Sequence, residues 1–227
     1  MNAIILAAGM GTRLRPLTNE IPKCLVPVNG VPMVERQIQF LHEKGIKDIT
    51  LVSGYKAEKL DYLKEKYGVD IVFNYKYDTC NNIFSMYLVR DRLHDTYVVE
   101  GDVYMDRNCF ETEMNHSAYF SMWKDEEVNE WGLKVDEQNK LMKVEIGKVR
   151  GYIMSGISYW TAEDAQKITA HIDELIASDN YMDLFWDNAV IDIYPSLDIH
   201  VHGVDCIYEI DTEAELRTLE AKLLQKA

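Results

Sequence analysis

The sequence lacks long hydrophobic runs and has few cysteines. None of its apolar stretches approaches the roughly 18–20 residues of a membrane-spanning helix. Its first residues, MNAIILAAG, include no basic segment, and their apolar run is too short for a signal peptide. The four cysteines contain no CxxC pair, so they signal neither a zinc site nor a disulfide framework; they are Cys24, Cys80, Cys109 and Cys206. We therefore expect a cytoplasmic protein with reduced thiols.

Positive charge is also scarce. The 227 residues include 24 Lys and Arg against 38 Asp and Glu, which gives a formal net charge of −14. Such a chain repels the phosphate backbones of DNA and RNA and anionic membrane surfaces, so we expect no nucleic-acid or membrane partner. The composition, 47% hydrophobic and 27% charged, is that of a folded chain. A small anionic ligand is compatible with this charge if a local basic loop or a divalent metal accompanies it.

Histidine is sparse, and only two of the six histidines lie close together. His200 and His202 are two residues apart, so on a strand both side chains point to one face and could bind a metal. Solvated strand histidines are the interpretation that we prefer.

Strands and helices alternate through the first hundred residues. Short apolar runs predict strands at residues 3–8, 48–53, 69–74 and 96–100. Apolar residues at helical spacing predict helices at residues 32–44, 56–67 and 82–93. This alternation is typical of a Rossmann-like α/β fold, a mixed, mainly parallel sheet with helices on both faces. Ligands bind such sheets beyond the carboxyl ends of the strands.

The second half is predicted to elaborate the same sheet. Strands are expected at residues 118–123, 132–135, 141–146, 152–160 and 199–204, and helices at residues 160–177, 182–191 and 212–226. No linker, low-complexity tract or internal repeat interrupts the sequence. We therefore predict a single domain over residues 1–227.

A glycine-rich loop follows the first predicted strand. Four small side chains in Leu6-Ala7-Ala8-Gly9-Met10-Gly11-Thr12 let the backbone N–H groups approach phosphate oxygens. Arg13 and Arg15 would add charge-assisted hydrogen bonds, and Lys23 follows after a proline. The loop is neither GxGxxG nor a GxxxxGK[ST] P-loop. A tight turn with surface arginines is the simple alternative, but the longer string through Lys23 favours a polyphosphate site.

Two aspartates are candidates for a metal site. Asp102 directly follows the strand at residues 96–100, and Asp211 lies far along the chain, two residues after Glu209. Mg²⁺ prefers carboxylate oxygens together with substrate phosphates, so two such groups over a triphosphate would suit it. The structural alternative places Asp102 in a turn and makes Asp211 the N-cap of the last helix, with Glu215 nearby. Glu209 could share a strand face with Asp211.

The string from Leu6 to Val28 resembles the signature LxAGxGTRLxPLT…PKxLxPV of nucleotidyltransferases, which transfer NMP from an NTP to a phosphorylated acceptor. The resemblance implies that the loop and Arg13 hold the NTP phosphates and that Lys23 contacts phosphate at the reacting centre. It also implies a Mg²⁺ site on Asp102 and Asp211. We accordingly divide the domain into a nucleotide-binding core at residues 1–110 and an acceptor-binding elaboration with a closing helix at residues 111–227.

Aromatic residues beside carboxylates suggest the acceptor. Ring faces attract a quaternary ammonium that cannot donate hydrogen bonds, and Trp131 and Phe185, with Glu209 or Asp187 nearby, could form such a cage. Core packing is the alternative, because Phe185 lies on a predicted helix. Sugar-1-phosphate members of the family carry a Glu-Lys-Pro type motif, from which the nearest string, Glu145-Ile146-Gly147-Lys148-Val149, departs.

Strings along nearly the whole chain are similar to bacterial phosphocholine cytidylyltransferases of the LicC type. They lie at residues 81–87, 129–131, 155–160, 183–188 and 208–211. This resemblance implies CTP as the donor, with Asn82 and Ser85 near the nucleotide. It also implies that Trp131, Phe185 and Glu209 surround choline.

The expected reaction is transfer of CMP from CTP to phosphocholine, which yields CDP-choline and pyrophosphate. Relatives use 2-aminoethylphosphonate, so this compound or phosphoethanolamine is an alternative acceptor. A sugar-1-phosphate nucleotidyltransferase and a non-catalytic nucleotide-binding regulatory subunit are more distant alternatives. The sequence leaves the oligomeric state open between monomer and homodimer.

Overall fold

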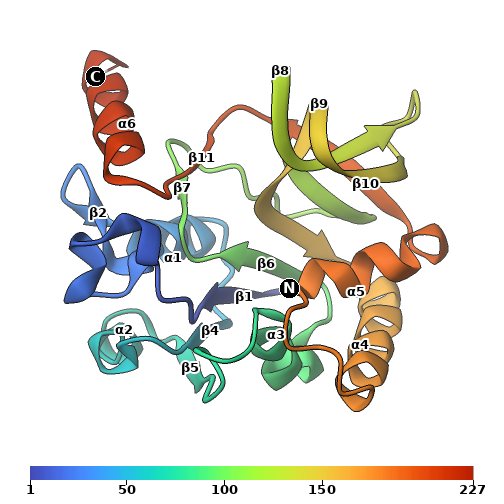
Figure 1. The fold of residues 1–227 in the computed structure, drawn as a ribbon, viewed down its shortest axis with the longest axis horizontal. Helices are drawn as coiled ribbons and strands as arrows, with labels where there is room; N and C mark the ends of the chain where they lie inside the picture. The colour runs from blue at the N-terminus through green and yellow to red at the C-terminus, as the bar shows by residue number, and fades with distance from the viewer. Residues whose placement is uncertain (227) are drawn as a thin grey trace.

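A seven-stranded sheet runs through the protein, whose computed structural model describes residues 1–226 (Figure 1). The strand order is β10-β8-β9-β6-β1-β4-β5. The strands are β1 (Asn2–Ala7), β4 (Ile49–Ser53), β5 (Asp70–Phe73), β6 (Thr96–Glu100), β8 (Ser117–Val135), β9 (Leu141–Trp160) and β10 (Ile199–Val204). All neighbours are parallel except β9, which is antiparallel to β6 and β8. The predicted mixed, mainly parallel α/β sheet is confirmed.

Helices cover both faces of this sheet. Because successive strand residues point to opposite sides, Ala3 and Ile5 of β1 lie in one hydrophobic core and Ile4 and Leu6 in the other. The first core is closed by α1 (Met33–Glu43) and α2 (Tyr62–Tyr67), and the second by α3 (Ile83–Val89), α4 (Ala162–Ala177) and α5 (Trp186–Ile193). Burial of one Leu or Ile side chain stabilises the fold by roughly 1.5–3 kcal/mol, so these layers hold the strand ends in place.

The β8–β9 pair corrects one prediction. The sequence predicts four short strands between residues 118 and 160, but the structure has two long ones. Pairing extends to Lys124, opposite Gly151, and resumes at Val128, opposite Val149, after an irregularity at residues 125–127. Side chains in that stretch are exposed or half-buried, so the apolar alternation disappears although the backbone ladder persists. Figure 1 shows the outer part of β8 and β9 bending away from the other strands.

The predicted helices are recovered with shorter bounds. Those at residues 32–44 and 212–226 are confirmed as α1 and α6 (Glu213–Lys226). The helix predicted at residues 56–67 splits into the 3₁₀ turn η4 (Ala57–Lys59) and α2, and the helix at 82–93 splits into α3 and η5 (Arg90–Arg92). The helix predicted from residue 182 begins only at Trp186, because the Asn188 side chain accepts the Phe185 N–H at 2.8 Å and caps the helix there.

A second, two-stranded sheet was not predicted. It pairs β7 (Val103–Met105) with β11 (Ile207–Glu209) in antiparallel register, with Glu209 opposite Val103. Because Asp102 directly precedes β7 and Asp211 closely follows β11, this ladder brings together carboxylates from distant parts of the chain. The remaining short elements are η1 (Thr12–Leu14), η2 (Leu17–Asn19), η3 (Lys23–Leu25), β2 (Pro27–Val28), β3 (Val31–Pro32) and η6 (Tyr194–Ser196).

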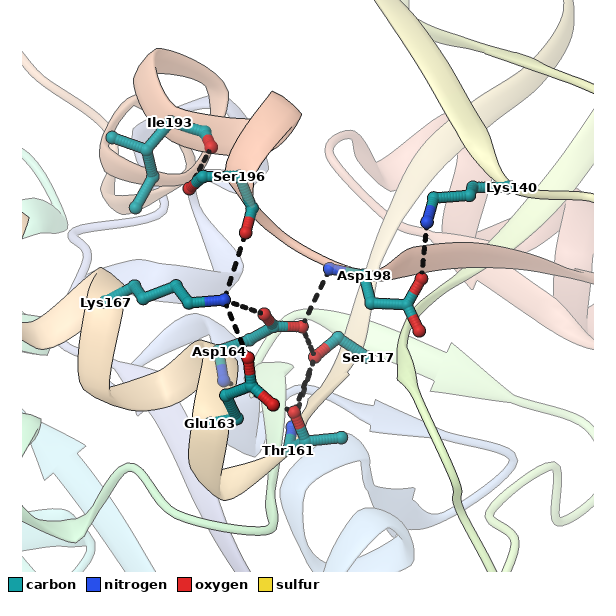
Figure 2. A network of polar contacts seen from close by, with 9 residues as sticks. All are labelled: Ser117, Lys140, Thr161, Glu163, Asp164, Lys167, Ile193, Ser196 and Asp198. Atoms are coloured by element: carbon teal, nitrogen blue, oxygen red, sulfur yellow. Dashed lines mark hydrogen bonds and ion pairs between the residues drawn. The ribbon is translucent and has the colours of Figure 1, made fainter.

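A buried carboxylate fastens α4 to the outer strands (Figure 2). Asp164 is 2% exposed, and its Oδ2 accepts hydrogen bonds from Ser117 Oγ at 2.6 Å and from the Asp198 N–H at 3.1 Å. Thr161 caps the helix by accepting the Asp164 N–H at 3.3 Å. These bonds compensate the burial of charge, so the second half is anchored on the same sheet as the first. The division after residue 110 stays a prediction.

No helix within residues 1–226 combines the length and the apolar character that crossing a membrane requires.

Candidate active site

A cavity of about 320 Å³ lies at the carboxyl ends of β1 and β6, where open α/β sheets bind ligands. It is lined by every residue predicted for the nucleotide, the catalytic charges and the metal: Leu6, Ala7, Ala8, Gly9, Gly11, Thr12, Arg13, Lys23, Asn82, Ser85, Asp102 and Asp211. The predicted acceptor residues Trp131, Phe185, Asp187 and Glu209 lie outside this lining. Arg15 is exposed and also lies outside it.

The loop after β1 presents backbone donors at the cavity. Among the described residues, the N–H groups of Gly9, Met10 and Gly11 find no acceptor. Backbone donors that lack a protein partner are available to an anion. Gly11 has φ +56°, and a Cβ built there would lie 2.8 Å from the Cβ of Lys23. Only glycine fits this approach, so the loop can close onto Lys23.

Lys23 is the central charge of the site. Its side chain is 11% exposed, and its Nζ donates to Asp102 Oδ2 and to Asp211 Oδ1, both at 2.7 Å. Burial opposes the charge, but the two carboxylates outweigh this effect and raise the pKa of Lys23. Arg13 Nη2 also contacts Asp211 Oδ1, at 2.8 Å. The predicted basic residues are thus paired with the predicted metal ligands.

Three carboxylates converge beside Lys23. One oxygen from each of Asp102, Glu209 and Asp211 lies within 4.8 Å of the others. Glu209 is partly exposed, yet desolvation of its carboxyl and the charges of Asp102 and Asp211 raise its pKa to about 7. An oxygen-only cluster of this kind has the donor chemistry that hard divalent cations prefer.

The carboxylate of Asp211 does not cap α6. Thr212 Oγ1 accepts the Glu215 N–H at 3.3 Å, while Glu215 Oε2 accepts the N–H groups of Asp211 and Thr212 at 2.9 and 2.8 Å. This reciprocal pair is a capping box. It leaves the Asp211 side chain free to face Lys23 and Arg13, so the structural alternative for Asp211 is wrong.

Ser85 and Asn82 form one wall of the cavity. Ser85 Oγ accepts from Asn74 Nδ2 at 2.9 Å, which leaves the hydroxyl hydrogen free to donate to a ligand. Asn82 contacts the protein at both ends of its amide, because its Nδ2 donates to Glu100 Oε1 at 3.0 Å and its Oδ1 accepts the Trp186 N–H at 2.8 Å.

Two aromatic rings meet edge to face beyond the carboxylates. The ring centroids of Trp131 and Phe185 are 5.8 Å apart with an interplanar angle of 84°. Phe185 is 45% exposed and precedes α5, so its predicted place within a helix is wrong and core packing does not explain it. Glu130, next to Trp131, interacts electrostatically with Asp211 and Arg13. This pair of rings, called the Trp131–Phe185 cage below, is thus connected to the charged centre through the neighbouring Glu130.

Asp187 is placed differently from these rings. Its Oδ1 accepts from the Tyr119 hydroxyl at 2.9 Å, and it lines a small cavity of about 20 Å³ between α5 and the sheet. Burial raises the pKa of Asp187 to about 6. No contact among the described residues joins its carboxylate to Trp131 or Phe185, so the structure does not bring it into the cage.

The family model for nucleotidyl transferases matches residues 2–145. The chain belongs to this nucleotidyl transferase family. It is 47% identical over 222 residues to the choline-phosphate cytidylyltransferase of Streptococcus pneumoniae, with 97% of each chain covered. It is 36% identical over 225 residues to the 2-aminoethylphosphonate cytidylyltransferase of Lancefieldella rimae, with 96% of this chain and 92% of the relative covered. The solved CTP:phosphocholine cytidylyltransferase (LicC) of Streptococcus pneumoniae has a TM-score of 0.96 and 46% identity, with 98% of each chain covered.

Sequence reasoning missed several residues that line the cavity of this nucleotidyl transferase. They are Cys24, Asn74, Tyr77, Cys80, Asn81, Glu100 and Gly101. Glu100 had a detectable signal, since it lies two residues before Asp102 at the end of a buried strand and therefore on the same side. Burial, followed by the nearby charges of Asp102, Asp187 and Glu209, raises the pKa of Glu100 well above its usual range.

The histidines lie away from the charged centre of the nucleotidyl transferase. The side chains of His200 and His202 are 21% and 24% exposed, so they are only partly solvated. Both pack against His116: the His116 and His200 centroids are 4.0 Å apart, and the Nε2 atoms of His116 and His202 are 3.0 Å apart. Parallel pairing of β10 with β8 creates this cluster.

Proposed function

We propose that this nucleotidyl transferase transfers CMP from CTP to phosphocholine and releases pyrophosphate. The observation that carries the proposal is the order of groups across the site. Loop N–H groups and Lys23 suit the triphosphate, three carboxylates suit a divalent cation, and the Trp131–Phe185 cage is connected to them through Glu130. The choline-phosphate cytidylyltransferase of Streptococcus pneumoniae, 47% identical over nearly the whole chain, supports the same assignment.

The acceptor phosphate is already a nucleophile, so no covalent enzyme intermediate is required. One of its oxygens attacks the α-phosphorus of CTP in line, and the bond to the β-phosphate oxygen breaks as pyrophosphate leaves. The enzyme contributes positioning and charge neutralisation. Lys23 stabilises the negative charge that develops on the transferred phosphoryl group, Arg13 binds the leaving pyrophosphate, and the loop N–H groups orient the phosphates.

Asp102 and Asp211 would hold a divalent cation, which we propose to be Mg²⁺. Their oxygens and that of Glu209 converge within 4.8 Å, and only oxygen donors are present, as Mg²⁺ requires. When bound, such an ion neutralises phosphate charge. Lys23 contacts both aspartates at 2.7 Å and keeps them together before a nucleotide arrives.

The head group distinguishes the two best acceptors. Aromatic ring faces bind a quaternary ammonium, whereas a primary ammonium is better served by carboxylates that accept its hydrogen bonds. The Trp131–Phe185 cage, in which Trp131 is half-buried and Phe185 is exposed, favours choline. The 2-aminoethylphosphonate cytidylyltransferase of Lancefieldella rimae, at 36% identity, keeps aminoethylphosphonate as the second candidate, because Glu130 and Glu209 lie nearby.

A pyrophosphate-release screen tests these assignments. The four common NTPs are combined with phosphocholine, 2-aminoethylphosphonate, phosphoethanolamine and glucose-1-phosphate in the presence of Mg²⁺. We expect release with CTP and phosphocholine above every other pair. Faster release with aminoethylphosphonate would reassign the acceptor, and release with glucose-1-phosphate and UTP or dTTP would point to sugar transfer. Nucleotide binding without release for any acceptor would point to a regulatory subunit.

A further inference from the structure

Glu100 occupies the boundary between two cavities. It lines both the nucleotide cavity and the small cavity that holds Asp187 beneath α5. Gly156 packs closely against Glu100: a side chain at position 156 would place its Cβ only 3.2 Å from the Cβ of Glu100. The backbone of Glu100 is held from the other side by Gln37 Nε2, which donates to its carbonyl oxygen at 2.9 Å. This side chain therefore has little freedom to move.

Three residues are linked by hydrogen bonds across this boundary. Asn82 Nδ2 donates to Glu100 Oε1 at 3.0 Å, and Asn82 Oδ1 accepts the Trp186 N–H at 2.8 Å. The Trp186 side chain lies close enough to the Glu100 carboxyl to influence its pKa. We call Glu100, Asn82 and Trp186 the boundary triad. It joins the end of β6 to the N-terminal ends of α3 and α5.

The position of Trp186 gives this triad a consequence for the acceptor. Phe185 directly precedes Trp186 in the chain. The Phe185 ring, which packs against Trp131, is therefore one peptide bond away from the Trp186 N–H that donates to Asn82. Asn82 lines the nucleotide cavity. A nucleotide that contacts Asn82 would therefore act on the backbone that carries Phe185.

We propose that Glu100 is a positioning residue that couples the nucleotide cavity to the Trp131–Phe185 cage through Asn82 and Trp186. The inference rests on the proposed function, because it takes the cage as the place where the cationic head group binds. The role assigned to Glu100 is indirect, although the residue also lines the nucleotide cavity. Its effect is to fix the orientation of the Asn82 amide, which has only one arrangement that satisfies both Glu100 and the Trp186 N–H.

The coupling is measured as a ratio of two affinities. Choline is titrated against the enzyme with Mg²⁺, with and without a CTP analogue that carries a methylene group between the α- and β-phosphorus atoms. Tryptophan fluorescence reports occupation of the cage. We expect the analogue to tighten choline binding at least about fivefold in the wild type, within the usual range of coupling between sites.

Two variants break the boundary triad without a large change in volume. Glu100→Gln leaves one acceptor oxygen in place of two for the Asn82 amide and the Trp186 indole, and Trp186→Phe removes the indole N–H. Each is expected to reduce the ratio below about twofold. Glu58→Gln, the same substitution at an exposed site, should keep the wild-type ratio. A loss of folded protein lowers the number of sites but does not change a ratio of dissociation constants, so this readout separates positioning from stability.

The outcomes separate the inference from the proposed function. A wild-type ratio near one, or an unchanged ratio in both folded variants, overturns the coupling while leaving CDP-choline synthesis intact. A wild-type enzyme that neither binds choline nor releases pyrophosphate with phosphocholine overturns the proposed function and this inference with it.

Discussion

Lys23 and the aspartates of this site interact as closely spaced opposite charges. Lys23 lies 2.7 Å from carboxylate oxygens of two aspartates, one 79 and the other 188 positions away along the chain. Removing one member of a buried charge pair leaves the others uncompensated, which costs more than the pair itself contributes. The charge of Lys23 therefore has a structural as well as a chemical consequence.

Lys23→Ala should reduce turnover at least about 10²-fold, by analogy with the loss of one electrostatic stabiliser. The same loss is expected for Asp102→Ala. Pyrophosphate release at saturating substrate measures the effect, and circular dichroism establishes that each variant is folded. Lys148→Ala is the matched control, because this lysine on β9 is 81% exposed. Near-wild-type release by Lys23→Ala would remove Lys23 from the mechanism.

Trp131→Ala should raise the KM for phosphocholine about tenfold with a smaller change in the KM for CTP. The lost cation–π contact of a desolvated ring is worth ~1–2 kcal/mol, and 1.4 kcal/mol corresponds to about a tenfold change in affinity. Steady-state kinetics with each substrate varied in turn measures both constants. Trp123→Ala is the control, since Trp123 is an exposed tryptophan on the same strand. An unchanged KM would show that the cage does not bind the head group.

Two local elements, the loop after β1 and the β7–β11 ladder, determine the geometry of the site. The loop after β1 must turn through a left-handed residue to bring its N–H groups over Lys23. The β7–β11 ladder then sets the spacing between Asp102 and the Glu209–Asp211 segment. Neither element contains a long apolar pattern, because β7 and β11, although largely buried, have only three residues each.

Gly11→Ala should impair both folding and activity. An L-residue at φ +56° costs roughly 1–2 kcal/mol, and the new Cβ would displace the Lys23 side chain at 2.8 Å. Gly30→Ala is the matched control, because Gly30 has φ +82° with no atom within 4 Å of the built Cβ. Both variants should lower the melting temperature, but only Gly11→Ala should lower turnover strongly. Equal turnover in the two variants would contradict the role of the close approach.

The cluster of His116 with His200 and His202, directly before β8 and on β10, predicts sensitivity to acid. Burial, together with His200 and His202, lowers the pKa of His116 below 6.5, although Asp198 and Glu111 act in the opposite direction. A histidine with a lower pKa in the folded state than in the unfolded chain takes up its proton more readily after unfolding. The protein therefore loses stability as the pH falls below about 6.5, the pKa of histidine in the unfolded chain. His116→Gln should therefore lose less stability than the wild type between pH 7 and pH 5.

Urea unfolding at these two pH values measures the difference between the proteins. The comparison with the variant is necessary because His171, beside Glu174 and Asp192, has a raised pKa and shifts stability in the opposite direction. Identical pH slopes for the two proteins would show that His116 does not contribute.

The whole molecule combines a net charge of −14 with a site for anionic substrates. Arg13 and Lys23 do not form a free basic patch, since both pair with carboxylates of the proposed cation site. Asp102, Glu209 and Asp211 converge, and repulsion among them, offset in part by Lys23 and Arg13, contributes to the raised pKa of Glu209. A divalent cation would relieve that repulsion in the folded state but not in the unfolded chain.

Mg²⁺ should therefore stabilise the protein. At about ten times its dissociation constant, a ligand of the folded state adds ~1.4 kcal/mol, which raises the melting temperature of a chain of this size by about 3–5 °C. Thermal unfolding with MgCl₂ and with NaCl at equal ionic strength measures the specific part. Asp211→Asn should lose most of it, and an equal shift in the variant would place the cation elsewhere.

The sequence by itself determined the alternation of strands and helices and the phosphate loop. These features depend on residues that are close along the chain, such as Leu6 to Thr12, where local conformation decides what the backbone can do. The prediction failed in β8 and β9, where strand pairing extends beyond the segment with alternating apolar residues. It also failed at α5, which begins at Trp186 because the Asn188 side chain caps the helix there.

Only the tertiary structure decided which of these residues meet. The β7–β11 ladder, the contact of Lys23 with Asp211 and the edge-to-face pair of Trp131 and Phe185 join segments that are far apart in sequence. The position of Glu100 between two cavities depends on such contacts as well, although its place beside Asp102 could be read from the sequence. Contacts of this kind depend on how strands are ordered in the sheet, and that order is set by packing of the whole chain and not by local pattern.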